Sequence, residues 1–471
     1  MSAFEVARAG VAALAGALAI AGCADVLDIR TTRVLVTDTP VDGRCEGMLR
    51  VRVLYDASGS TKDVGVAAGK GVLDYLRAVD AAGGIRGCRL DIAEGDTRYD
   101  VEATLAVYRD WASKPEWPEV TTVFGQGTPM TLALGPLVAQ EKKLLVTTAF
   151  SGEIAAAAPI EHDIGVPSLS GSFGEATLPV RKKSPGYPYV FFQGTDYTTS
   201  ARIAMNFIWK RGAKRVGFFA CSTSAFCTDP VDGAKTFLAL LGTTKVGRDL
   251  AIELDEDEAS IEQKIDSYFG EEQAKASSDP SYVPVDWIWF GNTRTSLANV
   301  GRALAKVSAK RSIAPKVITN NWGLDELLYT ECGDACVGIH GLQPYPAFGD
   351  GSAAGMANLL EVHRARRIAE GEPPTAHATV QYVYGFVAGA AWRAAVEAAL
   401  DAGVKPTGES LRAELERFQL RAMEGLATIS YMPTDHRPQS SARVYVLGQT
   451  GRLEPVGQPI SIALQSDWLG W

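Results

Sequence analysis

The chain is poor in the residues and motifs that mark catalysis or nucleic-acid binding. Only five of its 471 residues are histidine, and they are scattered along the sequence. There is no long basic run, and the formal net charge is −9, so a nucleic-acid partner is not expected. We find no GxSxG, P-loop or HExxH motif and no cysteine–histidine pair suited to nucleophilic work. We therefore expect no catalytic residue.

Long apolar segments are also missing, apart from one near the N-terminus. The run from Val11 to Ala21 is too short to span a bilayer as a helix but has the length of a signal-peptide core. It ends in Ile20-Ala21-Gly22-Cys23, which resembles a bacterial lipobox. We expect residues 1–22 to be a lipoprotein signal peptide, Cys23 to be lipidated, and residues 23–48 to form a tether. A plain signal peptide that contains a cysteine is the alternative.

These features predict an exported protein in the periplasm or cell envelope that meets the membrane through its N-terminal lipid. Ala24 stands where an aspartate would follow Cys23, which favours the outer membrane by resemblance to proteobacterial lipoproteins. We expect the protein to be a monomer.

Cysteines are few, and their parity fits export. Removing Cys23 from the seven leaves an even set, which suggests disulfides in an exported chain. The six can pair in several ways, but two pairs are close enough in sequence to close small loops, which leaves Cys45 with Cys88. The local pairs are Cys221 with Cys227 and Cys332 with Cys336. A zinc site is the competing interpretation, but neither local pair has CxxC spacing, so we expect no metal.

The remaining sequence alternates between predicted strands and helices. A chain of 471 residues exceeds one typical core of about 250–300 residues, so two lobes are expected. In the first half, apolar alternation and helical spacing predict strands at 49–55, 89–93, 120–124 and 144–148, with a helix over 101–112 capped by Asp100. Gly83-Gly84 supplies a helix stop. The pattern is βαβ with a parallel sheet.

A second α/β series begins at Tyr189. Its predicted strands are 189–192, 215–220, 286–290 and 316–319, and its predicted helices are 199–211, 231–241 and 296–309. Helices over 356–369, 379–402 and 408–418 and strands at 427–431 and 443–447 complete the chain. The polar stretches 164–186 and 271–284 are interpreted as surface loops.

The order of these segments resembles the leucine/isoleucine/valine-binding family of ABC-transporter receptors over about residues 49–450. The most specific stretch runs from Gly71 to Leu90, followed by Gly95-Asp96-Thr97. Four further segments match in order and spacing. They are residues 144–151, Gln193-Gly194-Thr195-Asp196, Trp289-Phe290-Gly291-Asn292, and the aromatic helix at 381–386.

The resemblance implies an α/β fold of two doubly wound parallel-sheet lobes, the type I periplasmic binding protein fold, joined by three hinge crossings. The crossings would lie near residue 194, Gln343 and Ser430. Lobe 1 would comprise residues 49–194 and 344–429, and lobe 2 residues 195–343 and 430–465. Such a receptor closes around a small amino-acid-like ligand and delivers it to an ABC permease. A ligand-sensing receptor of the same fold is the alternative.

The resemblance also implies residues that bind the carboxylate of an amino-acid ligand. Gly125-Gln-Gly-Thr128 joins a strand to a helix, so its backbone N–H groups and the Thr128 hydroxyl can meet a carboxylate. An ordinary βα turn is the alternative, and a dinucleotide cofactor is not expected, because Met130 stands where the fingerprint needs its third glycine. Ser58, Phe150 and Ser151 follow strands at matching positions. Phe150 either narrows the pocket or packs into the lobe.

The other lobe would contact the rest of the ligand. Asp196 aligns with the acid that holds the ligand ammonium, with a helix cap as the alternative. Phe226 falls where the family has a stacking tyrosine. Thr293 and Arg294 replace an aromatic pair, and Asn321 lies where the family carries a second ammonium-binding glutamate. A buried Arg294 would favour an anionic group on the ligand, and an exposed helix-start arginine is the alternative.

One rival motif remains. Asp56-Ala-Ser58-Gly-Ser60 follows a strand and looks like the start of a metal-ion-dependent adhesion site in von Willebrand A domains, where hydroxyls and carboxylate-bound water hold Mg²⁺.

Overall fold

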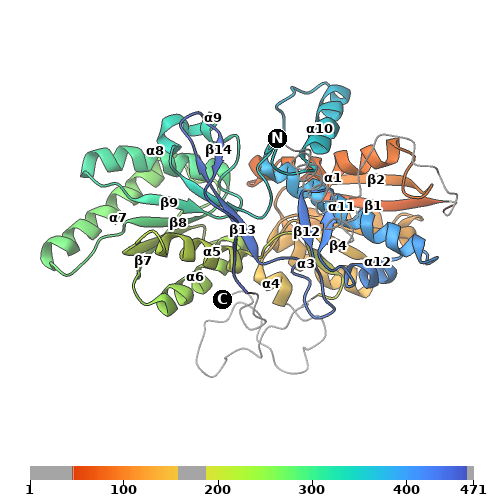
Figure 1. The fold of residues 1–471 in the computed structure, drawn as a ribbon, viewed down its shortest axis with the longest axis horizontal. Coiled ribbons are helices and arrows are strands. Elements are labelled where there is room, and N and C mark those ends of the chain that lie inside the picture. The colour runs from red at the N-terminus through yellow and green to blue at the C-terminus, as the bar shows by residue number, and fades with distance from the viewer. Residues whose placement is uncertain (1–44, 46, 157–186, 464–471) are drawn as a thin grey trace, which may run out of the picture.

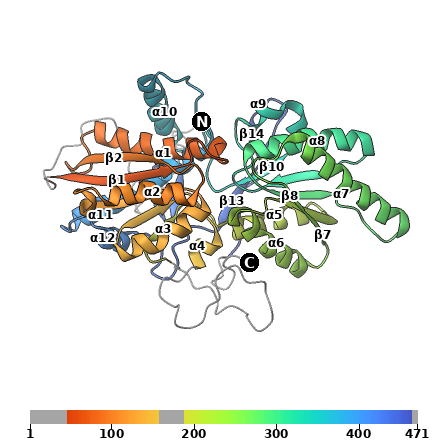
Figure 2. The same ribbon diagram turned by 180° about the vertical axis from the view of Figure 1, so that it is seen from behind.

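The computed structural model describes residues 45, 47–156 and 187–463. The polypeptide forms two lobes side by side, each a twisted sheet flanked by helices (Figures 1 and 2). The predicted signal peptide, Cys23 and the 164–186 stretch lie outside the described residues. Among the described residues, no helix is both long and apolar enough to cross a membrane.

The first sheet is wholly parallel. Its strands are β1 (Met48–Tyr55), β2 (Arg89–Asp96), β3 (Val120–Gly125), β4 (Leu144–Thr147) and β5 (Val190–Phe192). Their order in space is β2-β1-β3-β4-β5. All residues of β4 and β5 are buried, as expected for parallel strands covered on both faces.

The second sheet is parallel in its centre and antiparallel at one side. Its parallel strands are β6 (Arg215–Ala220), β7 (Lys245–Ala251), β8 (Trp287–Gly291), β9 (Lys316–Thr319) and β10 (His340–Gln343). β13 (Ser441–Leu447) runs antiparallel to β10, β14 (Leu453–Pro455) and β15 (Ile460–Ser461). The order is β14-β13-β10-β9-β8-β6-β7. A small hairpin of β11 (Arg421–Met423) and β12 (Ala427–Ile429) stands apart.

Helices cover both sheets. Those of the first lobe are α1 (Lys62–Ala81), α2 (Val101–Ala112), α3 (Thr128–Gln140), α4 (Gly152–Ala156), α10 (Met356–Glu370), α11 (Val380–Asp401) and α12 (Gly408–Leu415). Those of the second are α5 (Tyr197–Trp209), α6 (Ala225–Leu241), α7 (Glu258–Ser278), α8 (Arg294–Arg311) and α9 (Leu328–Cys332). The predicted fold class of two α/β lobes is confirmed.

The chain crosses between the lobes three times. It leaves the first sheet after β5 and enters α5, returns after β10 to α10, and passes from β12 to β13. The crossing segments are residues 193–196, 344–355 and 430–440. The two lobes can rotate about such segments as a hinge.

Local signals explain several element boundaries. Asp100 caps α2 by accepting a hydrogen bond from the Ala103 N–H, as predicted. α1 ends at Ala81 and is followed by the turn at Gly83-Gly84, where a Cβ on Gly84 would lie 1.9 Å from the Cys88 carbonyl oxygen. The interpretation of 271–284 as a loop is wrong in its first half, because 271–278 are the last turns of α7. Ile261, Ile265 and Tyr268 anchor that helix in the core at helical spacing.

Two glycines let α1 and α11 pack closely in the first lobe. A Cβ on Gly71 would lie 2.1 Å from the Tyr382 carbonyl oxygen, and one on Gly385 would lie 1.9 Å from that of Ala68. The backbones of the two helices are therefore in contact, which fixes the N-terminal end of α1 beside the cleft.

The three disulfides join the predicted pairs. They are Cys45–Cys88, Cys221–Cys227 and Cys332–Cys336. The second closes the loop between β6 and α6, which borders the cleft.

Candidate functional site

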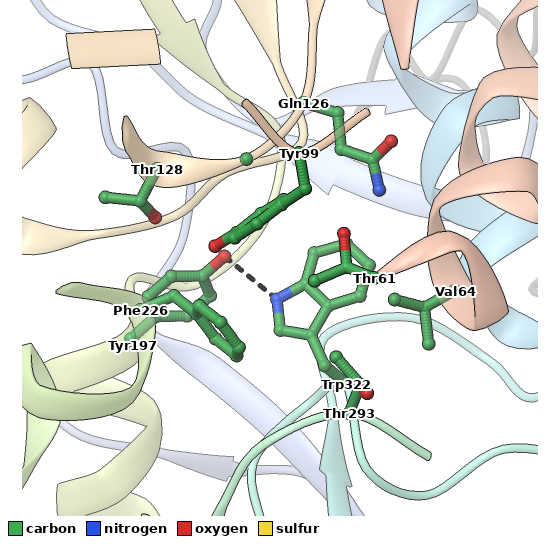
Figure 3. Close-up of a pocket in the computed structure, with 10 residues that line it drawn as sticks. Thr61, Val64, Tyr99, Gln126, Thr128, Tyr197, Phe226, Thr293 and Trp322 are labelled. Carbon is green, nitrogen blue, oxygen red and sulfur yellow. Dashed lines mark hydrogen bonds between the residues drawn. The ribbon is translucent and has the colours of Figure 1, made fainter. Parts of the chain in front are cut away.

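A pocket lies between the lobes, at the carboxyl ends of the parallel strands (Figure 3). It contains about 300 Å³ of empty space, including the part open to solvent. The first lobe contributes Thr61, Val64, Tyr99, Gln126, Gly127 and Thr128, and the second contributes Tyr197, Phe226, Thr293 and Trp322. This is the position where open α/β sheets bind ligands.

Five helices begin at the pocket wall. Thr61 precedes α1, Thr128 opens α3, Tyr197 opens α5, Phe226 lies in the first turn of α6, and Thr293 is the N-cap of α8. Each helix presents the positive end of its dipole and N–H groups that lack an intrahelical partner. No basic side chain lines the pocket, so its partial positive charge comes from these helix starts.

Backbone conformation positions the first lobe's aromatic residue. Arg98 and Tyr99 have φ values of 51° to 53°, a left-handed conformation that turns the chain after β2. Gly127 has a φ of 82°, and a Cβ there would lie 3.1 Å from the Tyr99 ring and 2.0 Å from the Met130 methyl carbon. Only glycine lets this loop lie against Tyr99.

Polar groups of the first lobe are arranged by Asp56. Its backbone N–H donates to Gln126 Oε1 at 3.1 Å, and its carboxylate accepts from the Thr61 hydroxyl at 2.8 Å. The Gln126 nitrogen is thereby turned toward the side of Thr61 and Val64 (Figure 3). The Thr128 side chain is only 1% exposed, and its hydroxyl makes no hydrogen bond of ordinary geometry with the described residues, although it faces the Tyr197 hydroxyl closely enough to oppose the rise that burial gives the pKa of that group.

The second lobe contributes a rigid aromatic pair. The Trp322 indole N–H donates to the Tyr197 hydroxyl at 2.8 Å, the bond drawn in Figure 3. Asn320 holds the turn before Trp322, since its side-chain oxygen accepts from the backbone N–H groups of Trp322 and Gly323. Burial raises the pKa of Tyr197 to about 12, so its hydroxyl stays protonated and, while accepting from Trp322, can donate its own hydrogen.

Phe226 completes the aromatic wall. Its ring meets that of Tyr99 edge to face, with the centroids 6.4 Å apart, across the two lobes. The Cys221–Cys227 disulfide encloses the residues just before it and fixes the start of α6.

Several hydrogen bonds join the lobes around the pocket. Tyr99 and Ser224 share one between their hydroxyls at 2.8 Å, and the Ser151 hydroxyl donates to Asp229 at 2.6 Å. The Thr295 backbone N–H donates to the Asp63 carboxylate at 2.9 Å. The lobes are thus in a closed arrangement.

Three of the predicted ligand residues line the pocket, namely Thr128, Phe226 and Thr293. The structure does not place the other six on its wall. Their ligand roles stay predictions, and their contacts point to other tasks.

Asp196 serves as the helix cap that we considered as its alternative role. Its carboxylate accepts from the backbone N–H and the hydroxyl of Thr199 at 2.8 and 2.6 Å, and Arg437 lies 3.4 Å away. The carboxylate is fully buried and satisfied by these groups.

Phe150, Ser151 and Ser58 lie near the cleft but not on its wall. Phe150 packs among aromatic rings of both lobes, including Trp322 at a centroid distance of 6.3 Å, so it fills the lobe junction. Ser151 makes the interlobe contact to Asp229 described above. Ser58 is exposed and donates to Asp96 at 2.6 Å.

Arg294 is buried, but its guanidinium is already paired. Nη1 lies 2.7 Å from Asp325 and Nε 2.5 Å from Glu331. An anionic ligand group would have to displace one of these carboxylates from Arg294, so the geometry does not support a ligand contact by this arginine. Because the side chain is buried, the alternative of an exposed arginine is not supported either.

Asn321 is the one predicted residue off the wall whose side chain is unsatisfied. It is buried, and neither its amide oxygen nor its nitrogen has a hydrogen-bond partner among the described residues. It directly precedes the wall residue Trp322.

The adhesion-site interpretation of Asp56 is not favoured. Its carboxylate accepts hydrogen bonds from the Gly59 and Thr61 N–H groups and from the Thr61 hydroxyl, which turns the loop into α1. Within the described ranges, no group of three or more histidine, cysteine, aspartate or glutamate side chains is arranged to hold a metal ion.

Sequence reasoning missed most of the wall. Thr61, Val64, Tyr99, Tyr197 and Trp322 were not predicted, and Gln126 was predicted only as part of the Gly125–Thr128 loop. Each lies just after a parallel strand or at a helix start. This location is the signal that the sequence offers for these residues. It does not single them out, because every loop at this end of the sheets shares it.

These features define a two-lobed solute-binding protein that holds its ligand at the hinge cleft. The chain belongs to the periplasmic binding protein family, whose model matches residues 49–452. Membership implies an extracytoplasmic solute-binding protein and not an enzyme.

Solved structures of low sequence identity share the fold. A substrate-binding protein of an ABC transporter from Aeropyrum pernix matches with a TM-score of 0.71 and 21% identity, covering 90% of this chain and 98% of that one. A branched-chain amino acid ABC transporter protein from Thermus thermophilus with bound valine matches with a TM-score of 0.70 and 17% identity, covering 89% and 97%. A fatty acid ABC transporter substrate-binding protein from Thermomonospora curvata gives 0.66 and 15%, covering 89% and 93%. No curated protein matches by sequence at a significant level.

Proposed function

We propose that this protein is a lipid-anchored receptor that closes around a small amino-acid-like solute and delivers it to an ABC permease. In this proposal lobe 1 comprises residues 49–194 and 344–429 and lobe 2 residues 195–343 and 430–465. Cys23 carries the lipid in the cell envelope, and the protein acts as a monomer.

The observation that carries the proposal is the pocket enclosed by both lobes. Its wall combines four aromatic rings with hydroxyl and amide groups at the starts of five helices. A ligand that touches both lobes stabilises their closed arrangement, because it makes all of its contacts only there. The uncapped start of α3 and the unpaired Thr128 hydroxyl suit the carboxylate of such a solute.

Sensing is the second candidate role. It would use the same closure with a different partner, and the lobe surfaces do not favour one partner over the other.

A thermal-shift panel tests the proposal. The full chain would be melted with amino acids, small peptides, polyamines and carboxylates, since a ligand of the folded state raises the melting temperature. We expect at least one solute to stabilise the wild type and the control Val404→Trp, whose site is exposed and outside the pocket. Val64→Trp fills the pocket and should abolish the shift.

Circular dichroism of the unliganded variants shows whether Val64→Trp still folds. A folded Val64→Trp protein that is stabilised as much as the wild type would contradict the proposal, because the solute would then bind elsewhere.

A further inference from the structure

The pocket has no ionised side chain on its wall. Its ten lining residues are aromatic, aliphatic, hydroxyl-bearing, amide or glycine. The carboxylates of Asp56, Asp63 and Asp229 belong to segments that contribute wall residues, and each accepts a hydrogen bond from a protein donor. A ligand ammonium would therefore lose its water without gaining a dedicated anionic partner, which is costly in a closed site.

The helix starts make the same pocket unfavourable for a cation and favourable for an anion. α1, α3, α5, α6 and α8 all point their N-terminal ends at it. Only α5 among these five has its N-terminal N–H groups capped by the side chain of its own N-cap residue. The start of α8 is partly offset by Asp63, which accepts from the Thr295 N–H, whereas the start of α3 has no side-chain cap.

The polar groups that face the pocket are donors. The Gln126 oxygen is taken by the Asp56 N–H, so its amide nitrogen is the group left to the ligand. The Tyr197 hydroxyl accepts from Trp322 and can donate its hydrogen. The Thr128 hydroxyl is buried and faces the Tyr197 hydroxyl on one side of the pocket, whereas the Gln126 nitrogen lies on the other side (Figure 3). The two neighbouring hydroxyls are the donors that can meet one acceptor-only group such as a carboxylate.

The rest of the wall is apolar. Val64, Phe226 and the rings of Tyr99 and Trp322 line the space between the polar groups (Figure 3). A hydrocarbon or aromatic body would bury its surface there.

We infer that the ligand is a monocarboxylate with an apolar body and no ammonium group. This inference rests on the receptor function proposed above and narrows its solute from an amino-acid-like molecule to a carboxylate without an amino group. The carboxylate lies at the start of α3 against Thr128 and Tyr197, and the apolar body lies among the aromatic rings. The acid that would hold an amino group, Asp196, is committed to Thr199 and Arg437.

Matched ligand sets test this inference directly. Calorimetric titrations of the full chain would compare 3-phenylpropanoate with L-phenylalanine and 2-phenylethylamine, and 4-methylpentanoate with L-leucine and 3-methylbutylamine. We expect a carboxylate to bind about tenfold or more tightly than its amino acid, because an unpaired ammonium must be desolvated. The amines and choline, a probe for cation binding by the aromatic rings, should give no heat.

A pair of variants locates the carboxylate. Thr128→Val keeps the side-chain shape and removes the donor, so it should weaken carboxylate binding by about tenfold. Thr330→Val, at an exposed position in α9, is the matched control and should bind like the wild type.

Several outcomes overturn the inference. An amino acid that binds at least as tightly as its carboxylate would do so, most clearly if Asp229→Asn then abolished that binding. Tight binding of choline, of an amine or of an uncharged solute, with no carboxylate of the panel bound, would also overturn it. In each of these cases the receptor function stands, whereas stabilisation that persists in Val64→Trp removes the function itself.

Discussion

At the residue scale, what decides the role of a polar group at the lobe junction is whether the protein already satisfies it. Thr128 and Asp196 are both buried and both stand at helix starts. The Thr128 hydroxyl lacks a partner, whereas the Asp196 carboxylate caps α5 and lies beside Arg437. A buried polar group without a partner costs free energy that a ligand can recover.

Asp196→Ala should therefore impair folding more than binding. It removes a helix cap worth about 1 kcal/mol and leaves Arg437 with one carboxylate fewer. We expect a lower melting temperature for the unliganded protein and a retained ligand-induced shift. Asp257→Ala, which removes the cap of α7, a helix that contributes no residue to the pocket wall, is the matched control. Loss of ligand binding with an unchanged melt would restore Asp196 to the ligand site.

The sequence was a partial guide at this scale. Thr128, Phe226 and Thr293 were predicted and line the pocket, since loops after parallel strands converge there. Tyr99 escaped because its place depends on left-handed backbone at Arg98 and Tyr99 and on contact with Gly127, a relation between distant segments. The role of Arg294 was also hidden from the sequence, because the carboxylates that pair with it, those of Asp325 and Glu331, come from a later part of the chain.

At the element scale, the closed arrangement depends on α1 and α8 meeting across the mouth of the pocket. Asp63 lies in the first turn of α1 and accepts from the Thr295 N–H in the first turn of α8. It acts as a helix cap supplied by the other lobe. Burial raises the pKa of Asp63, while the nearby Arg294 guanidinium opposes that rise.

Asp63→Ala should weaken ligand binding without unfolding either lobe. It removes an interaction made only in the closed arrangement, so we expect affinity for 3-phenylpropanoate or 4-methylpentanoate to fall by about tenfold, as for a lost cap. Calorimetric titration measures the change, and Asp110→Ala on the exposed face of α2 is the control. Equal affinities for wild type and Asp63→Ala would show that this contact does not stabilise closure.

Most elements were predictable because periodicity reports burial directly. The α2, β6 and β9 boundaries agree with the expected ranges to the residue. α7 was missed because its C-terminal turns are polar, and the few apolar anchors that define it lie upstream. β14 and β15 are short edge strands without a pattern of their own.

At the scale of the whole molecule, two lobes share three crossings and a pocket that both must form. The topology followed from the alternation of strands and helices, since parallel βαβ units leave few arrangements. The degree of closure has no local signal in sequence, because it depends on contacts between surfaces far apart in the chain, such as those of Ser151 with Asp229 and of Tyr99 with Ser224.

Small-angle X-ray scattering of the full chain tests the central claim that the lobes close on a ligand held between them. The radius of gyration would be measured alone and at saturating 3-phenylpropanoate or 4-methylpentanoate, with saturation established by calorimetry. We predict a smaller radius with the bound carboxylate, because its contacts to both lobes stabilise the closed arrangement. A bound carboxylate that leaves the radius of gyration of the wild type unchanged, and equal to that of folded Val64→Trp, would contradict the account.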